Sequence, residues 1–216
     1  ELRTPLQSII GFSELGAGRV RNDPMVAGMF SDILASGQRM LALVNDLLDV
    51  SKIDSAVGTI HLERTDLRPL LRTVVHELGP LFGAKHLTVD MRLPTTALSA
   101  KVDPFRFQQV VRNILANAIR FSPVGESIDV GARTASDGSL HIWFRDHGPG
   151  IPPDEFEDIF DAFVQSSKTK DGSGGTGLGL AICRKILDAH RGTISAGNAK
   201  DGGARFDVLL PANDFS

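Results

Sequence analysis

One stretch of the chain decides its fold: Gln109-Val110-Val111-Arg112-Asn113-Ile114-Leu115-Ala116-Asn117-Ala118-Ile119-Arg120. Its apolar residues recur every three or four positions, which predicts an amphipathic helix over roughly Pro104–Phe121. Asn113 and Asn117 lie four residues apart and Arg120 one further turn along, so the three side chains share a helical face. Amide oxygens can coordinate Mg²⁺ and a guanidinium can meet phosphate oxygens. Taken alone, the asparagine pair is also compatible with an ordinary solvated face.

The segments around this helix mix helical and strand patterns without the regular alternation of a doubly wound sheet. Further helices are predicted over Leu67–Leu78 and about residues 178–190. Strands are predicted at Leu87–Leu93, Ser127–Thr134, Leu140–Asp146, Gly192–Gly197 and Ala204–Leu210. The expected fold class is therefore α+β, with residues 67–213 forming an α/β sandwich whose mixed sheet is covered by helices.

Residues 1–56 predict an antiparallel helical hairpin. Leu2, Leu6, Ile9 and Ile10 share one face of the first helix, and Leu15 follows near its end. The next segment contains residues that break helices, namely Gly16, Gly18, Asn22, Asp23 and Pro24. The second helix, from about Met25 to Ile53, spaces its apolar residues by three and four, which is near the coiled-coil period.

Two such helices carry more apolar surface than one hairpin can bury. We therefore expect a homodimer through residues 1–56, with the two hairpins forming a four-helix bundle. Packing of the hairpin onto the rest of the same chain is the alternative. Residues 57–66 are polar, include Gly58 and predict a linker.

Two glycine-containing segments are typical of ligand-binding loops. Asp146-His147-Gly148-Pro149-Gly150-Ile151 follows an apolar strand, and its glycines would let the backbone approach a flat ligand closely. A tight turn capped by Asp146 is the alternative. The stretch from Gly172 to Ile182 leads into a helix, whose N-terminus offers amide hydrogens to anions. It matches neither a P-loop nor a dinucleotide fingerprint, and a flexible hinge is the alternative.

Composition excludes several classes of protein. The net charge of −3 provides no broad basic field, so nucleic acid is not an expected partner. The lone Cys183 cannot form an internal disulfide, and no Cys/His zinc pattern is present. No apolar run is long enough to span a bilayer and no signal peptide is visible, which favours a cytoplasmic setting. Because the sequence opens without Met, we expect a fragment of a longer protein, with membrane attachment only through an upstream segment.

The first six residues, Glu1-Leu2-Arg3-Thr4-Pro5-Leu6, form a further motif. Pro5 removes the hydrogen bond that would reach the carbonyl of Glu1, so a bend is expected there. An early helical position for Pro5 is the alternative.

Together these motifs resemble the conserved boxes of the sensor histidine kinases of two-component systems. Residues 1–6 match the six residues after the histidine in the phosphoacceptor box, and Asn113–Arg120 resemble the asparagine box. Asp146–Ile151 and Gly175–Gly179 resemble the two glycine boxes. The phenylalanine box is matched by Phe156, Phe160 and Phe163, and residues 190–194 and 203–206 also fit.

The resemblance implies a gyrase-like ATP-binding domain that uses ATP and Mg²⁺. Asp146 would bond the adenine amino group, Asn117 would hold Mg²⁺ with Asn113 assisting, and Arg120 would meet phosphate. A lid from about Asp161 to Thr176 would carry further phosphate contacts, although its lysines are also typical of a solvated surface. His147 is expected at the pocket edge. The full implied ATP-binding set is Asn113, Asn117, Arg120, Asp146, Gly148, Gly150, Ile151, Phe160, Phe163, Lys168, Lys170, Gly175, Thr176, Gly177, Leu178 and Gly179.

The resemblance also implies the chemistry of the hairpin. The acceptor histidine would stand immediately before Glu1, where the chain has no residue; a cut, disorder or chemical modification would each explain this. Glu1 would act as its base, and Thr4 would place water for dephosphorylating a response-regulator receiver domain. Both kinase and phosphatase activity are therefore expected of the parent protein.

Two other classes of protein stay open at this point. One is a nucleotide-binding scaffold, or degenerate kinase, that signals by shape alone. The other is an ATP-gated clamp of the gyrase or chaperone type. Those enzymes carry a carboxylate base where this chain has Asn113, and they lack the Glu1–Leu6 motif.

Overall fold

A computed structural model describes residues 3–19, 23–55, 60–169 and 177–212. The chain divides into two compact units, Glu1–Asp54 and Ser55–Ser216, and each is described by itself. Among the described residues, no helix is both long and apolar enough to cross a membrane.

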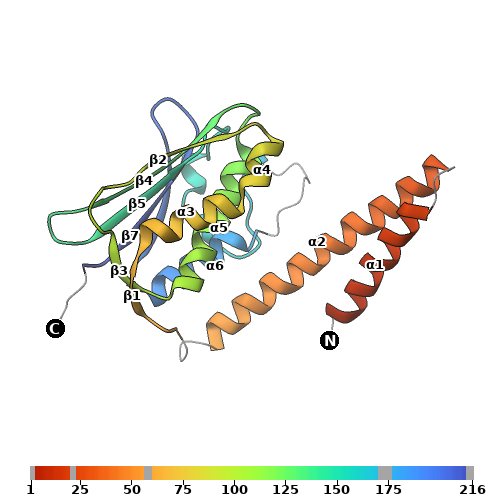
Figure 1. The fold of residues 1–216 in the computed structure, drawn as a ribbon, viewed down its shortest axis with the longest axis horizontal. Helices are drawn as coiled ribbons and strands as arrows, with labels where there is room; N and C mark the ends of the chain where they lie inside the picture. Colours follow the sequence, from red (N-terminus) through yellow and green to blue (C-terminus); the bar gives the residue numbers. More distant parts are fainter. Residues whose placement is uncertain (1–2, 20–22, 56–59, 170–176, 213–216) are drawn as a thin grey trace. The chain divides into compact units, whose positions relative to one another are not determined.

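The first unit is a helical hairpin of α1 (Arg3–Arg19) and α2 (Pro24–Ser55), which lie antiparallel side by side in Figure 1. The prediction that Gly16 and Gly18 break the first helix is wrong. Gly16 lies inside α1, where a β-carbon would come within 2.4 Å of the Phe30 ring. The glycine therefore makes room for the opposite helix. Gly37 plays the same part toward Ile10, at 3.1 Å.

The hairpin turn ends at a helix cap. The Asp23 carboxylate accepts hydrogen bonds from the backbone N–H groups of Met25 (3.0 Å) and Val26 (3.2 Å), and Pro24 begins α2. A capping Asp followed by Pro is a strong helix start, so the predicted break at this pair is confirmed. Pro5 lies in the first turn of α1, while Glu1, whose carbonyl enters the predicted bend, lies outside the described residues.

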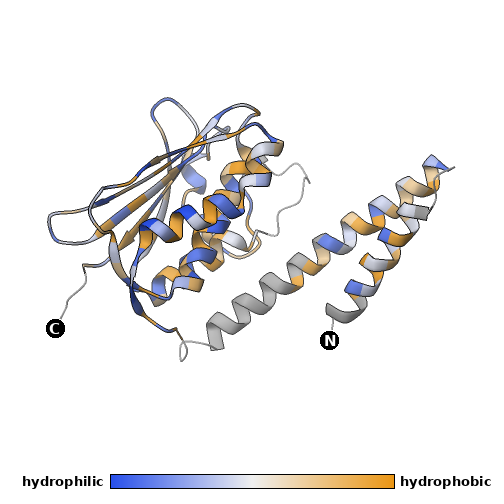
Figure 2. Cartoon of the chain, in the orientation of Figure 1, coloured by the Kyte–Doolittle hydropathy of each residue, from blue (hydrophilic) through white to orange (hydrophobic). Residues whose placement is uncertain are grey.

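Packing of the hairpin leaves a second apolar stripe exposed. Leu6 and Gly37 are buried between α1 and α2, whereas Phe12 and Met25 are each 72% exposed. Figure 2 shows apolar residues distributed along the coloured parts of both helices. Among the side chains that the structure describes in this unit, the exposed large apolar ones are Ile9, Phe12, Leu15, Met25, Met29, Ile33 and Met40.

The second unit is built on a five-stranded mixed sheet, as predicted. Its order is β2-β4-β5-β7-β6, with β2 parallel to β4 and the other pairs antiparallel. The strands are β2 (Thr88–Arg92), β4 (Ser127–Thr134), β5 (Leu140–Arg145), β6 (Thr193–Asn198) and β7 (Ala204–Leu210). Figure 1 shows α3 (Leu67–Glu77), α5 (Pro104–Phe121) and α6 (Gly179–Ala189) together on one side of the sheet.

Strand residues alternate between the helix-covered face and the open face. Ile142 and Phe144 of β5 are buried toward the helices, while Trp143 between them lies on the open face. The Trp143 ring lies over Gly131 of the neighbouring strand, where a β-carbon would come within 2.0 Å of it. Asp207 on this face is hydrogen-bonded to His141 at 2.6 Å and forms an ion pair with Arg205 at 2.8 Å, so one face forms the core and the other is polar.

Several short elements were not predicted. β1 (Glu63–Asp66) pairs with β3 (Ser99–Val102) in an antiparallel two-stranded sheet, so the last four residues of the predicted linker are a strand. The helix α4 (Gly79–Ala84) follows α3 after a single residue. Three 3₁₀ turns lie at Pro153–Glu155, Asp158–Phe160 and Ser167–Thr169. These elements are short and lack sustained periodicity, which is why the sequence pattern did not indicate them.

Helix α5 is fixed at both ends. The Asp103 carboxylate accepts from the N–H groups of Phe105 and Arg106, both at 3.1 Å, and Pro104 begins the helix. At the other end the Lys85 ammonium group donates to the carbonyl oxygens of Ile119 (3.0 Å), Arg120 (2.7 Å) and Ser122 (3.1 Å). A cation there satisfies the last carbonyls and complements the negative end of the helix dipole.

His190 joins the end of α6 to the start of α5. Its Nε2 accepts a hydrogen bond from the Asp103 N–H at 2.9 Å, and its Nδ1 lies 2.6 Å from the carbonyl oxygen of Ile186. A backbone N–H can only donate, so Nε2 is unprotonated and Nδ1 carries the hydrogen. The ring is buried, and burial lowers the pKa of His190.

We expect this unit to lose stability when the solution becomes acidic. The pKa of His190 is lower in the folded state than in the unfolded state, where it is about 6.5. The contribution of His190 to the free energy of unfolding is therefore complete above about pH 6.5 and is lost as the pH falls below that value. The variant His190→Leu should be destabilised by about 1–3 kcal/mol at pH 8 and should lose less on acidification, since it has no proton to gain. Urea denaturation followed by fluorescence of the single Trp143 measures this difference. Equal losses for both proteins between pH 8 and pH 5.5 would exclude His190 as the cause.

Candidate functional site

A cavity of about 340 Å³ opens between α5, the start of α6 and the segment after β5. Its size falls within the range of small-molecule pockets. The cavity is lined by Asn113, Ala116, Asn117, Arg120, Phe121, Asp146, Pro149, Gly150, Ile151, Ile159, Val164, Gln165, Ser166, Gly177, Gly179, Leu180, Ala204 and Phe206.

One wall is the polar face of α5. Asn113, Asn117 and Arg120 all line the cavity, so the structure brings together the three side chains singled out in this helix. The opposite face of α5 is fully buried, at residues such as Val110 and Ile114, which holds the polar face in a fixed direction. The Asn113 Nδ2 donates to the carbonyl oxygen of Gly179 at 3.1 Å and so links this wall to α6.

Asp146 provides a buried carboxylate at one end of the cavity. Its Oδ1 accepts hydrogen bonds from the N–H groups of Gly148 (2.8 Å) and Ala204 (3.0 Å). No residue in the described part of the chain donates to its Oδ2, which is left for a ligand. Burial raises the pKa of Asp146, while the two backbone hydrogen bonds and then the charges of His147 and Arg145 oppose that rise. The site therefore holds a directed acceptor suited to an N–H donor.

The glycines after Asp146 lie where side chains would not fit. A β-carbon at Gly148 would come within 2.7 Å of the Phe121 carbonyl oxygen, so this segment packs directly on the end of α5. Gly150 has a φ of 70°, a conformation that favours glycine, and lines the cavity beside the buried Ile151. His147 does not line the cavity; its Nδ1 bonds the Ser127 carbonyl oxygen at 2.7 Å, because its side chain turns toward β4.

The N-terminus of α6 provides the other end of the cavity. Gly177 and Gly179 line it, while the Leu178 side chain is buried in the core and its backbone occupies the N-cap position. Leu178 makes no side-chain cap hydrogen bond with any residue that the structure describes. No side-chain cap from the described residues uses the first N–H groups of α6, and these groups carry the positive end of the helix dipole. Such a terminus is suited to phosphate.

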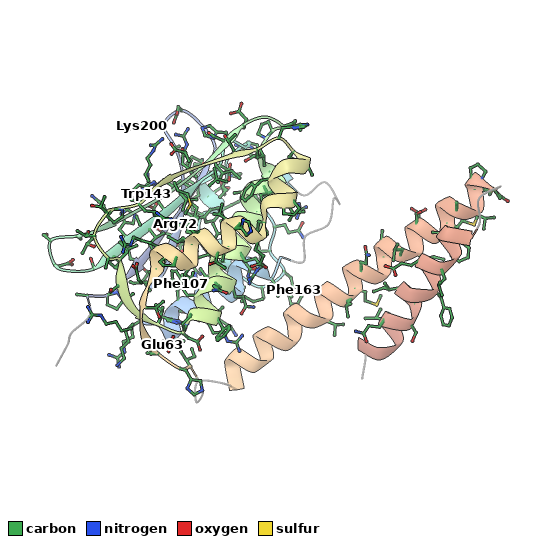
Figure 3. All side chains as sticks on the ribbon, viewed as in Figure 1. Glu63, Arg72, Phe107, Trp143, Phe163 and Lys200 are labelled. Carbon is green, nitrogen blue, oxygen red and sulfur yellow. The ribbon has the colours of Figure 1, made fainter. Side chains whose placement is uncertain are left out.

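The phenylalanines of the predicted phenylalanine box do not line the cavity. Phe160 is buried and packs edge-on against Phe206, which does line the cavity, with ring centroids 6.4 Å apart. Phe163, labelled in Figure 3, is 59% exposed and has a φ of 68°; its N–H donates to the Gly177 carbonyl oxygen at 3.0 Å. The residues of this segment that reach the cavity are Val164, Gln165 and Ser166, and they were not predicted.

The remaining candidates are placed only in part. Lys168 donates from Nζ to the carbonyl oxygen of Pro149 at 3.2 Å, which links its turn to the cavity wall. The other candidates, or in the case of Thr4 its side chain, lie outside the described residues: Glu1, Thr4, Lys170, Gly175 and Thr176.

The polar groups of the cavity could bind a hard cation only together with a ligand that supplies further oxygen atoms. Across residues 3–19, 23–55, 60–169 and 177–212, no three His, Cys, Asp or Glu side chains cluster as a metal site. The bond from Asn113 Nδ2 to Gly179 leaves the Asn113 Oδ1 as an acceptor, and Asn117 lies one turn along on the same face. Mg²⁺ usually retains several waters and binds few protein oxygens together with substrate phosphates, so these amides fit that role.

The sequence analysis did not assign several of the lining residues to the site. Ala116 is a small residue beside Asn117, and it leaves space over the polar face of α5. Ala204 and Phe206 come from β7, more than fifty residues beyond Asp146. Their strand was predicted, but pairing of β7 with β5 is a long-range contact that no local pattern indicates.

Two family descriptions match the chain. The histidine kinase-, DNA gyrase B-, and HSP90-like ATPase family matches residues 102–214, and the His Kinase A (phospho-acceptor) domain matches residues 1–56.

Similar proteins include sensor kinases from several bacteria. Sensor histidine kinase TmoS of Ectopseudomonas mendocina is 35% identical over 99% of this chain and 22% of its own length. Sensor protein kinase WalK of Staphylococcus haemolyticus is 32% identical over 98% of this chain and 35% of its own. Sensor protein KdpD of Escherichia coli is 33% identical over 98% of this chain and 23% of its own. The chain therefore spans about a fifth to a third of the length of these three relatives.

Solved structures show the same fold. Full-length ShkA in complex with AMPPNP has a TM-score of 0.78 and 28% identity, covering 97% of this chain and 43% of that one. The catalytic domain of histidine kinase ThkA has a TM-score of 0.62 and 28% identity, covering 69% of this chain and 95% of that one. With these matches, the chain belongs to the histidine kinase-, DNA gyrase B-, and HSP90-like ATPase family, and its two domains are those of a sensor histidine kinase core.

Proposed function

We propose that this chain is an ATP-dependent protein-histidine kinase core of a two-component system. Residues 67–213 bind ATP with Mg²⁺, and residues 1–56 carry the phosphoacceptor site and the dimer interface, with 57–66 between them. The observation that carries the proposal is one cavity that joins the buried acceptor of Asp146, the amide face of α5 and the N-terminus of α6.

The polar groups at the two ends of the cavity indicate where the base and the phosphates of the nucleotide would bind. The Oδ2 of Asp146 accepts from the adenine amino group, while the α6 N-terminus and Asn113 face the phosphates. Arg120 starts nearer the Asp146 end of α5 and would reach the phosphates with its long side chain. Helix α5 passes between the ends: Asn113 contacts Gly179, and the Phe121 carbonyl lies against Gly148. Those two residues of α5 are separated by about 12 Å along its axis at 1.5 Å per residue, which suits an extended nucleotide.

Phosphoryl transfer asks the protein mainly for positioning. A nitrogen of the histidine before Glu1 attacks the γ-phosphorus, the N–P bond forms, and the bond to the ADP oxygen breaks. Asn117 and Asn113 would hold Mg²⁺, which would neutralise charge on the phosphates. The Glu1 carboxylate orients the imidazole and accepts the proton of the ring nitrogen that does not attack. The chain then passes the phosphoryl group to an aspartate of a response-regulator receiver domain.

The hairpin supports a homodimer as the working form. Its exposed stripe, which includes Phe12 and Met25, is the surface that a second hairpin would cover to form a four-helix bundle. Thr4 would serve in the reverse reaction by placing water for dephosphorylation of the regulator. ATP and a receiver domain are both cytoplasmic, so we propose that location for this core.

The rival interpretation as an ATP-gated clamp is disfavoured by Asn113. An amide cannot act as the carboxylate base that directs water in those enzymes, and here its nitrogen already donates to Gly179.

The kinase proposal predicts a labile phosphohistidine. A chain carrying His directly before Glu1 should, with labelled ATP and Mg²⁺, gain phosphate that acid removes, and the same chain with Gln at that position should not. Bound nucleotide without acid-labile phosphate would instead identify a nucleotide-binding scaffold. Appreciable ATP hydrolysis by residues 67–213 alone would identify a clamp-type ATPase.

The variant Asp146→Asn should separate binding from stability. Asn keeps an Oδ1 for Gly148 and Ala204 but replaces Oδ2 with a donor, so ATP affinity should fall by about 1–3 kcal/mol. Because the pKa of Asp146 is raised on folding, its charge costs stability above that pKa, and the variant without nucleotide should be more stable at pH 7. Titration calorimetry and urea denaturation measure both effects. The exposed Asp154→Asn is the control, and an unchanged affinity for ATP would show that Asp146 does not contact adenine.

The double variant Met29→Glu, Ile33→Glu should be a monomer. Both side chains lie on the exposed stripe of α2, and each would lose about 1.5–3 kcal/mol of apolar burial on introduction of a charge. Ser31→Glu, Gln38→Glu adds the same charge to exposed positions on the opposite side of α2 and should leave the dimer intact. Sedimentation equilibrium measures the dissociation constant. A dimer unaffected by the first pair would place the interface elsewhere.

A further inference from the structure

The hairpin of β6 and β7 contacts the segment Asp146–Ile151 at both of its ends. Lys200, labelled in Figure 3, lies at its turn, and its last register pair is Asn198 with Ala204. Neither Asn198 nor the turn lines the cavity, so they can affect a ligand only through the cavity wall. These contacts nevertheless reach both ends of the wall segment.

Asn198 contacts the far end of the segment. Its Oδ1 accepts from the Ile151 N–H at 2.9 Å, and its Nδ2 donates to the Ile151 carbonyl oxygen at 2.7 Å. One side-chain amide thus satisfies both backbone groups of Ile151, as a neighbouring strand would. Although Asn198 itself is exposed, Ile151 is buried and lines the cavity.

Gly150 makes this approach possible. A β-carbon at Gly150 would come within 2.7 Å of the Asn198 Oδ1. The φ of 70° at Gly150 turns the backbone so that the amide of Asn198 can reach the next residue. The second glycine of this segment therefore has a structural partner as well as a place in the cavity wall.

The register partner of Asn198 contacts the near end. Ala204 donates its N–H to the Asp146 Oδ1 at 3.0 Å and accepts from the Asp146 N–H at 3.0 Å. A β-carbon at Gly203 would come within 1.9 Å of the Asp146 carbonyl oxygen, so the hairpin lies directly on this residue. One register pair therefore sets the separation between the Asp146 carboxylate and Ile151.

We propose that Asn198 is a positioning residue for recognition of the purine base, a role that it performs by holding Ile151 in place relative to the Asp146 carboxylate. The inference rests on the proposed ATP binding at this cavity. Without the amide, both backbone groups of Ile151 lose their partner and the base-contacting wall can shift away from Asp146. The affinity should therefore fall most for a nucleotide whose base donates a hydrogen bond to Asp146.

The test compares ATP with ITP, whose base lacks the amino group that Asp146 would accept. Dissociation constants of both nucleotides are measured on the full chain by titration calorimetry, for wild type, Asn198→Ala and Asn198→Ser. Loss of the two hydrogen bonds predicts that Asn198→Ala binds ATP about tenfold more weakly. ITP, which already lacks the Asp146 contact, should weaken by about threefold or less. Serine keeps one hydrogen bond and should lie between wild type and alanine.

Two controls separate positioning from folding. Ser195→Ala changes an exposed residue of the same strand and should leave both dissociation constants unchanged. Urea denaturation followed by Trp143 fluorescence should show Asn198→Ser fully folded under the binding conditions.

The outcomes distinguish this inference from the proposed function. The inference fails if wild type binds ATP and the Asn198 variants bind it equally well. It also fails if the variants lose affinity for ATP and for ITP by the same factor, because Asn198 would then not position the base site. If weakening follows only the unfolded fraction, its role is purely structural and the inference is again overturned. Failure of wild type itself to bind ATP would instead remove the proposed function.

Discussion

The cavity of the second unit, Ser55–Ser216, depends on the orientation of α5. This helix buries one face completely in the core, and its ends are held by the Asp103 carboxylate and the Lys85 ammonium group. A helix fixed in rotation and along its axis must present its remaining face at one place, and that face carries Asn113, Asn117 and Arg120. Core packing and helix capping, rather than any contact between these three residues, therefore bring them to the same cavity.

The second constraint is the burial of an acidic group. Asp146 is almost fully buried, and burial raises its pKa despite two backbone hydrogen bonds. A charge in such a place is unfavourable for folding unless it is paired, and neither hydrogen bond uses its Oδ2. The domain therefore sacrifices stability at this residue, as expected where an acceptor is kept ready for a ligand. The polar open face of the sheet, with its exposed ion pairs, contains no comparable group among the described residues.

The sequence predicted well the elements that have strong local signals. The predicted bounds of α5 agree with the structure, in which Asp103 caps the helix before Pro104. Strands β4 and β7 alternate clearly and were also placed correctly. Gly16 was taken as a breaker because the pattern cannot show that Phe30 of another helix needs its space. β1 and β3 are held by pairing with each other, which is a tertiary contact.

The candidate site divides in the same way. Residues in the asparagine and glycine motifs could be named from the sequence because each motif is continuous along the chain. Ala204 and Phe206 lie in the segment 203–206 that fits the family pattern, but they were not assigned to the site, because they enter it through strand pairing with β5. Phe160 was expected at the ligand and lies instead beneath Phe206, since the pattern of aromatic residues does not distinguish a cavity wall from the core behind it.

The two ends of the cavity are prepared for a ligand in different ways. At the Asp146 end, the carboxylate and Ile151 are held by backbone and amide hydrogen bonds from the β6–β7 hairpin, so the acceptor is in place before any ligand arrives. At the α6 end, the helix N-terminus has no side-chain cap among the described residues, and its N–H groups are suited to an anion. A ligand with a flat donor at one end and negative charge at the other satisfies both ends at once. A base or a phosphate alone satisfies only one end, and this asymmetry favours the complete nucleotide over either of its parts.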